Sequence, residues 1–198
     1  MSSLWTPYQA LAQDSLSSVL AEAAKQDIVI LNYHETKQLV FLQDAIPTSG
    51  VIFLAGNQFV LEQRYPDRLL ISIDKQRLRF FVPEKHIYHS KMLSSPMLQR
   101  VLKLFRPLMS GDEEALKEAF ETIFFVDKSG WRLDLTPKDK NASELKHIQI
   151  IGKSAQAAHQ ALIKMVDGST SKWDFAMQVP SDKAIERMQT LLLESKGL

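Results

Sequence analysis

The stretch WRLDLTP, residues 131–137, decides how this chain folds, because its polarity changes at nearly every residue. The apolar positions Trp131, Leu133 and Leu135 alternate with the charged positions Arg132 and Asp134. Successive side chains of a β-strand point to opposite faces of the sheet. The pattern therefore predicts a strand with one apolar face and one wet face.

The stretch SKWDFAMQ, residues 171–178, repeats this pattern near the C-terminus. Its apolar positions are Trp173, Phe175 and Met177, and its charged positions are Lys172 and Asp174. The dipeptide Asp167-Gly168 separates it from another apolar stretch at residues 160–166, and such a dipeptide between two strands is a strong hairpin signal. We therefore predict neighbouring antiparallel strands here.

β-Branched and aromatic residues also cluster at residues 28–36, 50–54, 59–63 and 69–82. Turn sequences containing Pro, Gly, Asn or Asp separate these clusters, which is typical of an antiparallel meander. Further strands are predicted at residues 122–126, 131–136 and 145–151. A sheet of about nine strands does not stay flat and open, so we predict strong curvature.

Three regions have helical periodicity instead. They are residues 7–25, which begin at Thr6-Pro7; a helix pair at about 91–121, which begins at Ser94-Ser95-Pro96 and continues from Glu113; and a last helix from Ser181. Such helices are expected to cover the apolar face of the sheet. The sequence thus predicts one α+β domain, residues 1–198. Its single strongly curved antiparallel sheet is an unclosed half β-barrel, covered by a helical lid inserted at about 92–121.

The composition excludes several classes of protein. The 198 residues include 24 Lys plus Arg against 23 Asp plus Glu, so the formal net charge of +1 argues against nucleic acid or an anionic membrane as a partner. The absence of Cys excludes disulfides, thiolate metal sites and cysteine nucleophiles. Apolar runs such as residues 39–42 and 51–55 are far shorter than the roughly 20 residues that span a bilayer.

The sequence offers little for catalysis. It contains no G-x-S-x-G, G-x-G-x-x-G, P-loop or H-E-x-x-H motif. Of the five histidines only His86 and His89 are close in sequence, and they lack an evident third ligand. Asp112, Glu113 and Glu114 fit a first helical turn. We therefore expect no enzyme, no metal and no cofactor.

The helix pair is the most distinctive feature, and it contains Met92, Met97 and Met109. Methionine adapts to irregular apolar partners, so the pair is a candidate ligand-binding lid. The alternative is that these helices close an ordinary core.

Six stretches together resemble the periplasmic lipoprotein carrier family, LolA and its relatives. They are residues 32–37 (NYHETK), 46–53 (IPTSGVIF), 63–66 (QRYP), 70–74 (LISID) with Leu78, 131–137 (WRLDLTP) and 148–152 (IQIIG). The resemblance rests on the order and spacing of these stretches, from about Ser15 to Met177. It also includes the Asp167-Gly168 hairpin.

The resemblance implies an unclosed β-barrel with a helical lid that holds acyl chains of a lipoprotein or lipid. It implies a monomeric, non-enzymatic periplasmic carrier with an inner-membrane donor and an outer-membrane acceptor, made as a precursor whose signal peptide is absent from this sequence. The residues expected to line the cavity are Phe53, Phe80, Trp131, Leu133, Ile150, Trp173 and Phe175 on the sheet, with Met97, Val101, Leu104 and Phe105 on the lid.

Two departures from the family pattern favour a LolA-like paralogue with a glycolipid or another acylated product as cargo. Relatives carry an Arg-Pro pair after the second strand, whereas this chain has residues 55–58 (AGNQ) there, and its end is helical from Ser181. Two other hypotheses stay open: a solid-core protein-interaction module, and an enzyme acting on acyl chains through His86 or His89.

Overall fold

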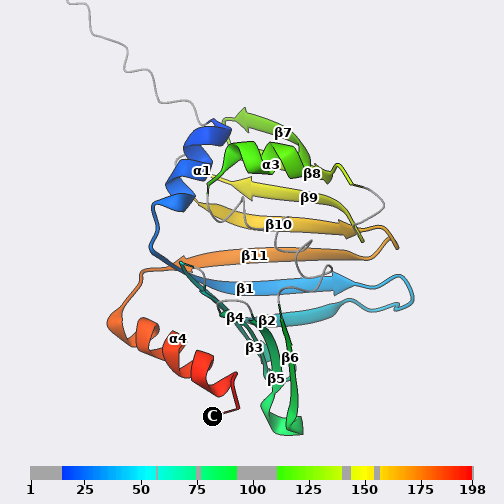
Figure 1. Cartoon of the computed structure of the whole chain (residues 1–198). Helices are drawn as coiled ribbons and strands as arrows, with labels where there is room; N and C mark the ends of the chain where they lie inside the picture. Colours follow the sequence, from blue (N-terminus) through cyan, green and yellow to red (C-terminus); the bar gives the residue numbers. More distant parts are fainter. Residues whose placement is uncertain are drawn as a thin grey trace, which may run out of the picture.

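The computed structural model describes residues 15–56, 58–74, 77–92, 111–139, 144–153 and 157–197. These residues form one antiparallel sheet of eleven strands with helices packed against it (Figure 1). The strands are β1 (Ile28–Gln38), β2 (Ile46–Ala55), β3 (Gln58–Tyr65), β4 (Leu69–Asp74), β5 (Arg77–Val82), β6 (Ile87–Met92), β7 (Phe120–Asp127), β8 (Gly130–Pro137), β9 (Leu145–Gly152), β10 (Ala158–Met165) and β11 (Thr170–Gln178). The helices are α1 (Leu16–Ala24), α3 (Glu113–Ala119), α4 (Asp182–Glu194) and the short 3₁₀ helix η1 (Pro83–Lys85).

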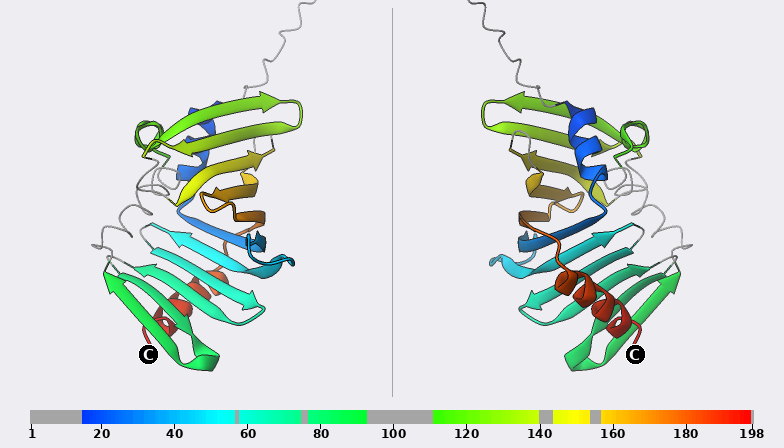
Figure 2. Two further views of the ribbon diagram at one scale, coloured as in Figure 1. Left: turned by 90° about the vertical axis from the view of Figure 1, so that its right-hand side faces the viewer. Right: turned by 90° about the vertical axis from the view of Figure 1, so that its left-hand side faces the viewer.

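The sheet consists of two meanders joined at one ladder. Its order is β6-β5-β4-β3-β2-β1-β11-β10-β9-β8-β7, so β1 pairs with both β2 and β11. Strands β6 and β7 are the two edges, and the sheet does not close. In Figure 1, β7–β11 run across the view, whereas β3–β6 run steeply downward, and Figure 2 shows the same bend from both sides. The predicted fold class, a single curved and unclosed antiparallel sheet with helices, is confirmed.

Cross-strand pairing defines an inner face that continues through both meanders. Leu133 lies opposite Ile150, Ile150 opposite Ala161, and Ala161 opposite Trp173. Residues directly opposite each other in an antiparallel pair place their side chains on the same face. We call the face that carries these side chains the inner face, and the other the outer face.

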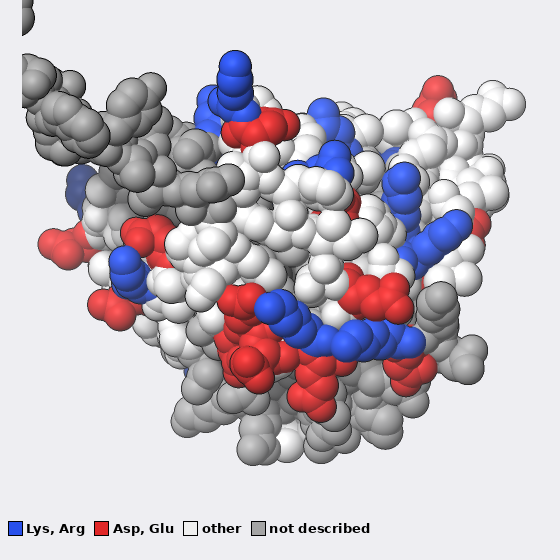
Figure 3. Space-filling view, turned by 90° about the horizontal axis from the view of Figure 1, so that it is seen from above, with Lys and Arg blue, Asp and Glu red and all other residues white. Residues whose placement is uncertain are grey.

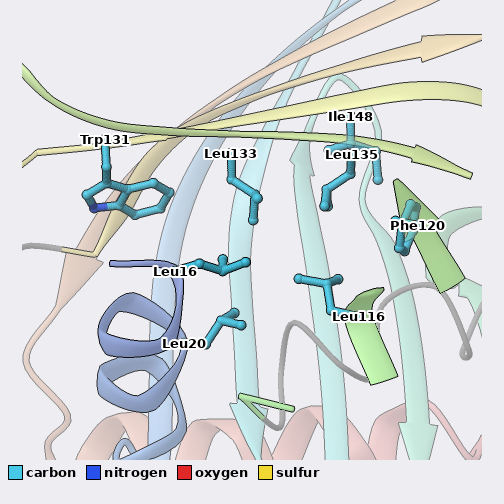
Figure 4. Close-up of a cluster of buried hydrophobic side chains, with 8 residues drawn as sticks. All are labelled: Leu16, Leu20, Leu116, Phe120, Trp131, Leu133, Leu135 and Ile148. Carbon is cyan, nitrogen blue, oxygen red and sulfur yellow. The ribbon is translucent and has the colours of Figure 1, made fainter. Parts of the chain in front are cut away.

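Helices α1 and α3 cover the inner face at the β7–β9 end of the sheet (Figure 4). Their buried residues are Leu16, Leu20 and Leu116, and the strand side chains of the same cluster are Phe120, Trp131, Leu133, Leu135 and Ile148. Helix α1 begins with a capping box at Ser15, and α3 begins where the Asp112 carboxylate accepts a hydrogen bond from the Ala115 N–H. Local capping thus sets where each helix starts, and burial of its apolar side fixes where it packs.

Helix α4 packs against the outer face of β1–β4, at the other end of the sheet. Its buried residues Met188, Leu191 and Leu192 contact a group of strand side chains made up of Ile30, Val51, Phe53, Val60 and Leu70. This arrangement differs from the prediction that every helix covers the same face. The reason is that residues 51–54 are apolar at each position, so β2 has apolar side chains for both faces.

An ion-pair network also holds α4 in place. The carboxylate of Glu62, which is 1 % exposed, accepts hydrogen bonds from Arg187 of α4 and from Arg64 and Arg68. Arg68 also pairs with Glu194, one turn after Leu191. A buried carboxylate is stabilised only when its oxygens are paired in this way.

Strand β6 was missed by the sequence analysis, which placed residues 91–121 in a helix pair. Residues 87–92 are a strand, because η1 and the left-handed turn at His86 (φ 48°) bring the chain back against β5. Helix α3 confirms the predicted second helix of the pair. The first helix of that pair, residues 7–14 of the predicted first helix, and the cap at Thr6-Pro7 lie outside the described residues.

Charges are mixed on the surface. Figure 3 views the β7 end of the sheet from above, and Lys and Arg side chains lie there beside Asp and Glu side chains. Among the described ion pairs, Lys25 pairs with Glu22 on α1, and Lys117 pairs with Glu113 on α3. None of the helices within the described ranges has the length and apolar character needed to cross a bilayer.

Candidate functional site

A third apolar cluster lies on the inner face of the central strands, and we call it the strand-only cluster. Its buried members are Tyr33, Ile52 and Leu61, and its partly buried members are Leu31, Leu54, Phe59, Ile71, Trp173 and Phe175. Among the described residues every member comes from a strand, whereas each of the other two clusters includes helix residues. This part of the inner face is therefore the candidate ligand-binding surface.

Three aromatic rings form the centre of the strand-only cluster. The ring centroids of Tyr33 and Trp173 are 5.0 Å apart with the planes tilted by 39°, and those of Trp173 and Phe175 are 6.0 Å apart and stacked. Tyr33 is fully buried, whereas Trp173 and Phe175 are half-buried. Half-buried aromatic rings offer a large apolar contact area with little loss of side-chain entropy on binding.

A buried carboxylate adjoins these rings. Glu35 lies opposite Trp173 in the β1–β11 ladder and is 6 % exposed. Its Oε2 accepts a hydrogen bond of 2.9 Å from the Thr48 hydroxyl, and its Oε1 accepts one from the Ser171 hydroxyl. The Lys37 ammonium lies 3.6 Å from Oε1. The carboxylate is thus held by neighbouring strands, with both oxygens in use.

Tyr33 is kept neutral by this environment. Burial raises the pKa of its hydroxyl to about 12, and the negative charge of Glu35 acts in the same direction, while a hydrogen bond with Thr48 opposes the rise. The Tyr33 ring therefore remains an apolar neighbour for Trp173 throughout the physiological pH range.

Trp173 carries an unpartnered donor. Its indole Nε1 is buried and has no hydrogen-bond partner, and within the described residues the same is true of Arg79 Nη1 and His159 Nδ1. His159 lies at a bulge of β10, where the register with β9 shifts between Ala158 and Gln160. Buried polar groups without partners are uncommon in folded proteins, so each calls for a physical explanation.

The structure places the predicted cavity residues in three different locations. Trp173 and Phe175 belong to the strand-only cluster, and Phe80 is on the same face opposite Ile71. Trp131 and Leu133 are on the inner face but pack in the cluster covered by α1 and α3 (Figure 4), and Ile150 packs against the same cluster. Phe53 faces α4 on the outer face, contrary to the expected orientation. Met97, Val101, Leu104 and Phe105 lie outside the described residues.

The packing around Trp131 is especially close. A Cβ added to Gly152, which lies opposite it in the β8–β9 ladder, would be 2.1 Å from a ring carbon of Trp131. The indole therefore lies directly against the glycine backbone. Trp131 fills space in the covered part of the inner face and does not border the strand-only cluster.

Several residues of the site were not expected from the sequence. Tyr33, Ile52 and Leu61 are the most buried members of the strand-only cluster, and Glu35 is buried beside it. The available signal was the period of two in β1, where Leu31 and Tyr33 share a face with Glu35. A charged residue in such a pattern normally indicates the solvent-exposed face. The alternation alone therefore did not predict that Glu35 is buried on the inner face.

Neither of the two histidines singled out in the sequence belongs to the strand-only cluster. His86 is exposed in the turn before β6, and His89 of β6 lies beside Phe80, with ring centroids 6.4 Å apart. In the part of the chain that the structure describes, no three His, Asp or Glu side chains are grouped as a metal site would require.

Comparisons with known proteins return likeness in structure alone. No family model matches the chain, and no curated protein matches it. The chain is similar to a LolA superfamily protein from Nitrosomonas europaea, with 13 % identity and a TM-score of 0.42 over 85 % of this chain and 94 % of that one. It is also similar to the Mycobacterium tuberculosis lipoprotein LppX, with 10 % identity and a TM-score of 0.47 over 84 % and 97 % of the two chains.

A DUF1329 family protein from Desulfovibrio piger is similar as well, with 8 % identity and a TM-score of 0.45 over 84 % of this chain and 91 % of that one.

Proposed function

We propose that this protein is a non-enzymatic carrier that binds acyl chains on the inner face of its sheet. The observation that carries the proposal is the strand-only cluster. It gathers half-buried Phe59, Ile71, Trp173 and Phe175 on one continuous face without contributing side chains from α1, α3 or α4. Apolar surface of this kind, gathered on a sheet rather than scattered, is typical of a site for an apolar ligand.

Burial of methylene groups supplies the affinity that a carrier needs. Each buried methylene contributes about 0.8 kcal/mol, so ten of them contribute roughly 8 kcal/mol before ordering costs are subtracted. Without those costs the gain would correspond to a dissociation constant on the order of 1 μM, and the costs weaken binding from that limit, so release of the ligand stays possible. No reacting group is required.

We further propose that the cargo is an acylated lipoprotein or a lipid, and that the protein moves it through the periplasm between an inner-membrane donor and an outer-membrane acceptor. In this proposal the segment that connects β6 to β7 acts as the lid, with α3 as its fixed end. Leu116 and Phe120 support that role, because both are fully buried against the β7–β9 end of the inner face.

The test is native mass spectrometry of protein extracted gently, together with titration by a fluorescent acyl probe. We expect co-purifying lipid or saturable uptake of the probe. Phe175→Ala on the inner face should weaken uptake, whereas the matched change Phe125→Ala should not, because Phe125 is 46 % exposed on the outer face of β7. Absence of both lipid and uptake, or equal effects of the two changes, would favour a solid-core interaction module instead.

A further inference from the structure

Within the part of the chain that the structure describes, the indole of Trp173 is the one buried polar group of the strand-only cluster that has no hydrogen-bond partner. The side chain projects from β11 onto the inner face between Tyr33 and Phe175, and its Nε1 is buried without a hydrogen-bond partner. An indole N–H can only donate. The unused group is therefore a donor that needs an acceptor in an otherwise apolar setting.

We propose, on the basis of the function proposed above, that Trp173 binds the carbonyl of a neutral acyl ester and so selects esters over plain hydrocarbon chains and over free fatty acids. A hydrocarbon chain has no acceptor, so it would leave the buried N–H unsatisfied. An ester carbonyl would accept from Nε1, with its chain lying along Phe175 and the other apolar side chains of the cluster. A buried donor that is left without an acceptor costs more free energy than one hydrogen bond contributes on net. Such a group therefore selects against ligands that have no acceptor.

The surrounding polar groups favour an ester over other acyl groups. Among the described residues, no buried side-chain oxygen lacks a hydrogen-bond partner, so the N–H of an amide ligand would find no unused buried acceptor of that kind. An ester carries acceptors only, which matches the single unused donor at Trp173.

The charge beside Trp173 disfavours a carboxylate ligand. Glu35 lies directly opposite Trp173, is buried, and already accepts hydrogen bonds from Thr48 and Ser171. Its Lys37 partner is half exposed at 3.6 Å, so much of that positive charge faces water. A second carboxylate at this position would meet like charge where screening by water is weak.

The experiment compares three ligands of equal chain length: methyl laurate, dodecyl methyl ether and laurate anion at pH 7.5. Each is measured by displacement of a neutral fluorescent probe from the full chain. Methyl laurate and dodecyl methyl ether share the methoxy oxygen and differ only in having C=O or CH₂ at one position, so the comparison isolates the carbonyl acceptor. The variant Trp173→Phe keeps an aromatic ring but removes the N–H, and Trp131→Phe makes the same change in the covered cluster.

We compare the ratio of ester affinity to ether affinity in the two proteins. This ratio should be roughly 2- to 12-fold larger for the wild-type chain than for Trp173→Phe, which is the range that one net hydrogen bond contributes. The Trp131→Phe variant should keep the wild-type preference, and laurate should bind more weakly than the ester. Circular dichroism melting curves check that each variant is folded. Indole ¹⁵N–¹H spectra should show a larger shift of the Trp173 Nε1–H signal with the ester than with the ether, because the ester carbonyl is the stronger acceptor.

The other outcomes separate the two proposals. If none of the three ligands binds, the acyl carrier function itself is wrong. If ester and ether bind the wild-type chain and Trp173→Phe with the same ratio, the carrier function stands and the role of Trp173 is overturned. A stronger affinity for laurate than for the ester would contradict the selection against carboxylates.

Discussion

Arg187 of α4 donates to both oxygens of the buried Glu62 carboxylate on β3, with its Nη2 2.8 Å from each. The two residues come from distant parts of the chain, and Glu62 is shielded from water. This pair therefore joins the C-terminal helix to the outer face of the sheet, and its removal should weaken the packing of α4 on that face.

The variant Arg187→Ala should lower the free energy of unfolding by about 1–3 kcal/mol. The estimate is below that for a fully orphaned buried charge, because Arg64 and Arg68 still donate to Glu62. Urea denaturation measures the change. The control is Lys183→Ala, which removes an exposed cation one turn earlier on α4. Equal losses for the two variants would contradict the network.

Stability should also fall in acid because of Glu62. Burial alone would raise the pKa of its carboxyl, but the hydrogen bonds from Arg187 and Arg64 outweigh burial and lower the pKa below its ordinary value of 4.5. A carboxyl with a lower pKa in the folded state binds protons more readily when unfolded. Its contribution is thus complete above about pH 4.5 and is lost as the pH falls through the folded pKa.

The measurement is the free energy of unfolding between pH 3 and pH 7 for the wild-type chain and Glu62→Gln. The variant should be less stable at pH 7 but should lose less stability on acidification. If the free energy of unfolding of Glu62→Gln falls with pH as steeply as that of the wild-type chain, the acid sensitivity comes from other carboxyls.

An opposite dependence is expected in alkali from Tyr33. Its hydroxyl has a pKa of about 12 in the folded chain against an ordinary value of 10.0, so the unfolded chain releases this proton first. The contribution to stability is complete below pH 10.0 and is lost as the pH rises toward 12. Tyr33→Phe should therefore lose less stability between pH 9 and pH 11 than the wild-type chain, whereas Tyr65→Phe, at an exposed position, should behave as the wild-type chain does.

Gly152→Ala should lower the free energy of unfolding by about 1–3 kcal/mol, the usual effect of inserting a methyl group into a packed interior. The new Cβ would lie 2.1 Å from the Trp131 ring, which must shift or leave. Thermal and urea unfolding measure the loss. The same change made in a Trp131→Leu background should be tolerated better, and Lys153→Ala serves as the exposed neighbour control. A loss that is independent of residue 131 would point to backbone strain instead.

The side-chain directions were predicted best for the strands that have one solvent-exposed face. In β8 and β11 the charged residues Arg132 and Asp174 mark the outer face, so the inward direction of Leu133 and Trp173 followed from the alternation alone. In β2 no such mark exists, because both faces are buried, one under α4 and one in the strand-only cluster. The orientation of Phe53 therefore depends on a helix more than a hundred residues away, which a local pattern does not reveal.

The same reasoning explains the other misses. Strand β6 shows no alternation of apolar and polar residues, because its apolar residues Ile87 and Tyr88 are adjacent, and its conformation comes from pairing with β5. Glu35 is buried because Thr48 and Ser171, from two neighbouring strands, supply its hydrogen bonds. Local periodicity sets the direction of each strand's side chains, but the partners that make an exception stable come from the tertiary structure.

The single ladder between β1 and β11 has a consequence for how the chain reaches its folded state. Strands β1–β6 pair with sequence neighbours, and so do β7–β11, so each meander can form from local contacts. The β1–β11 pairing, by contrast, joins residues near position 30 to residues near position 178. Closing so long a loop is slow, and during synthesis it must wait until the final strand has left the ribosome. Until then the two halves of the inner face stay separate, so the strand-only cluster is completed only after β11 has been made and has supplied Trp173 and Phe175.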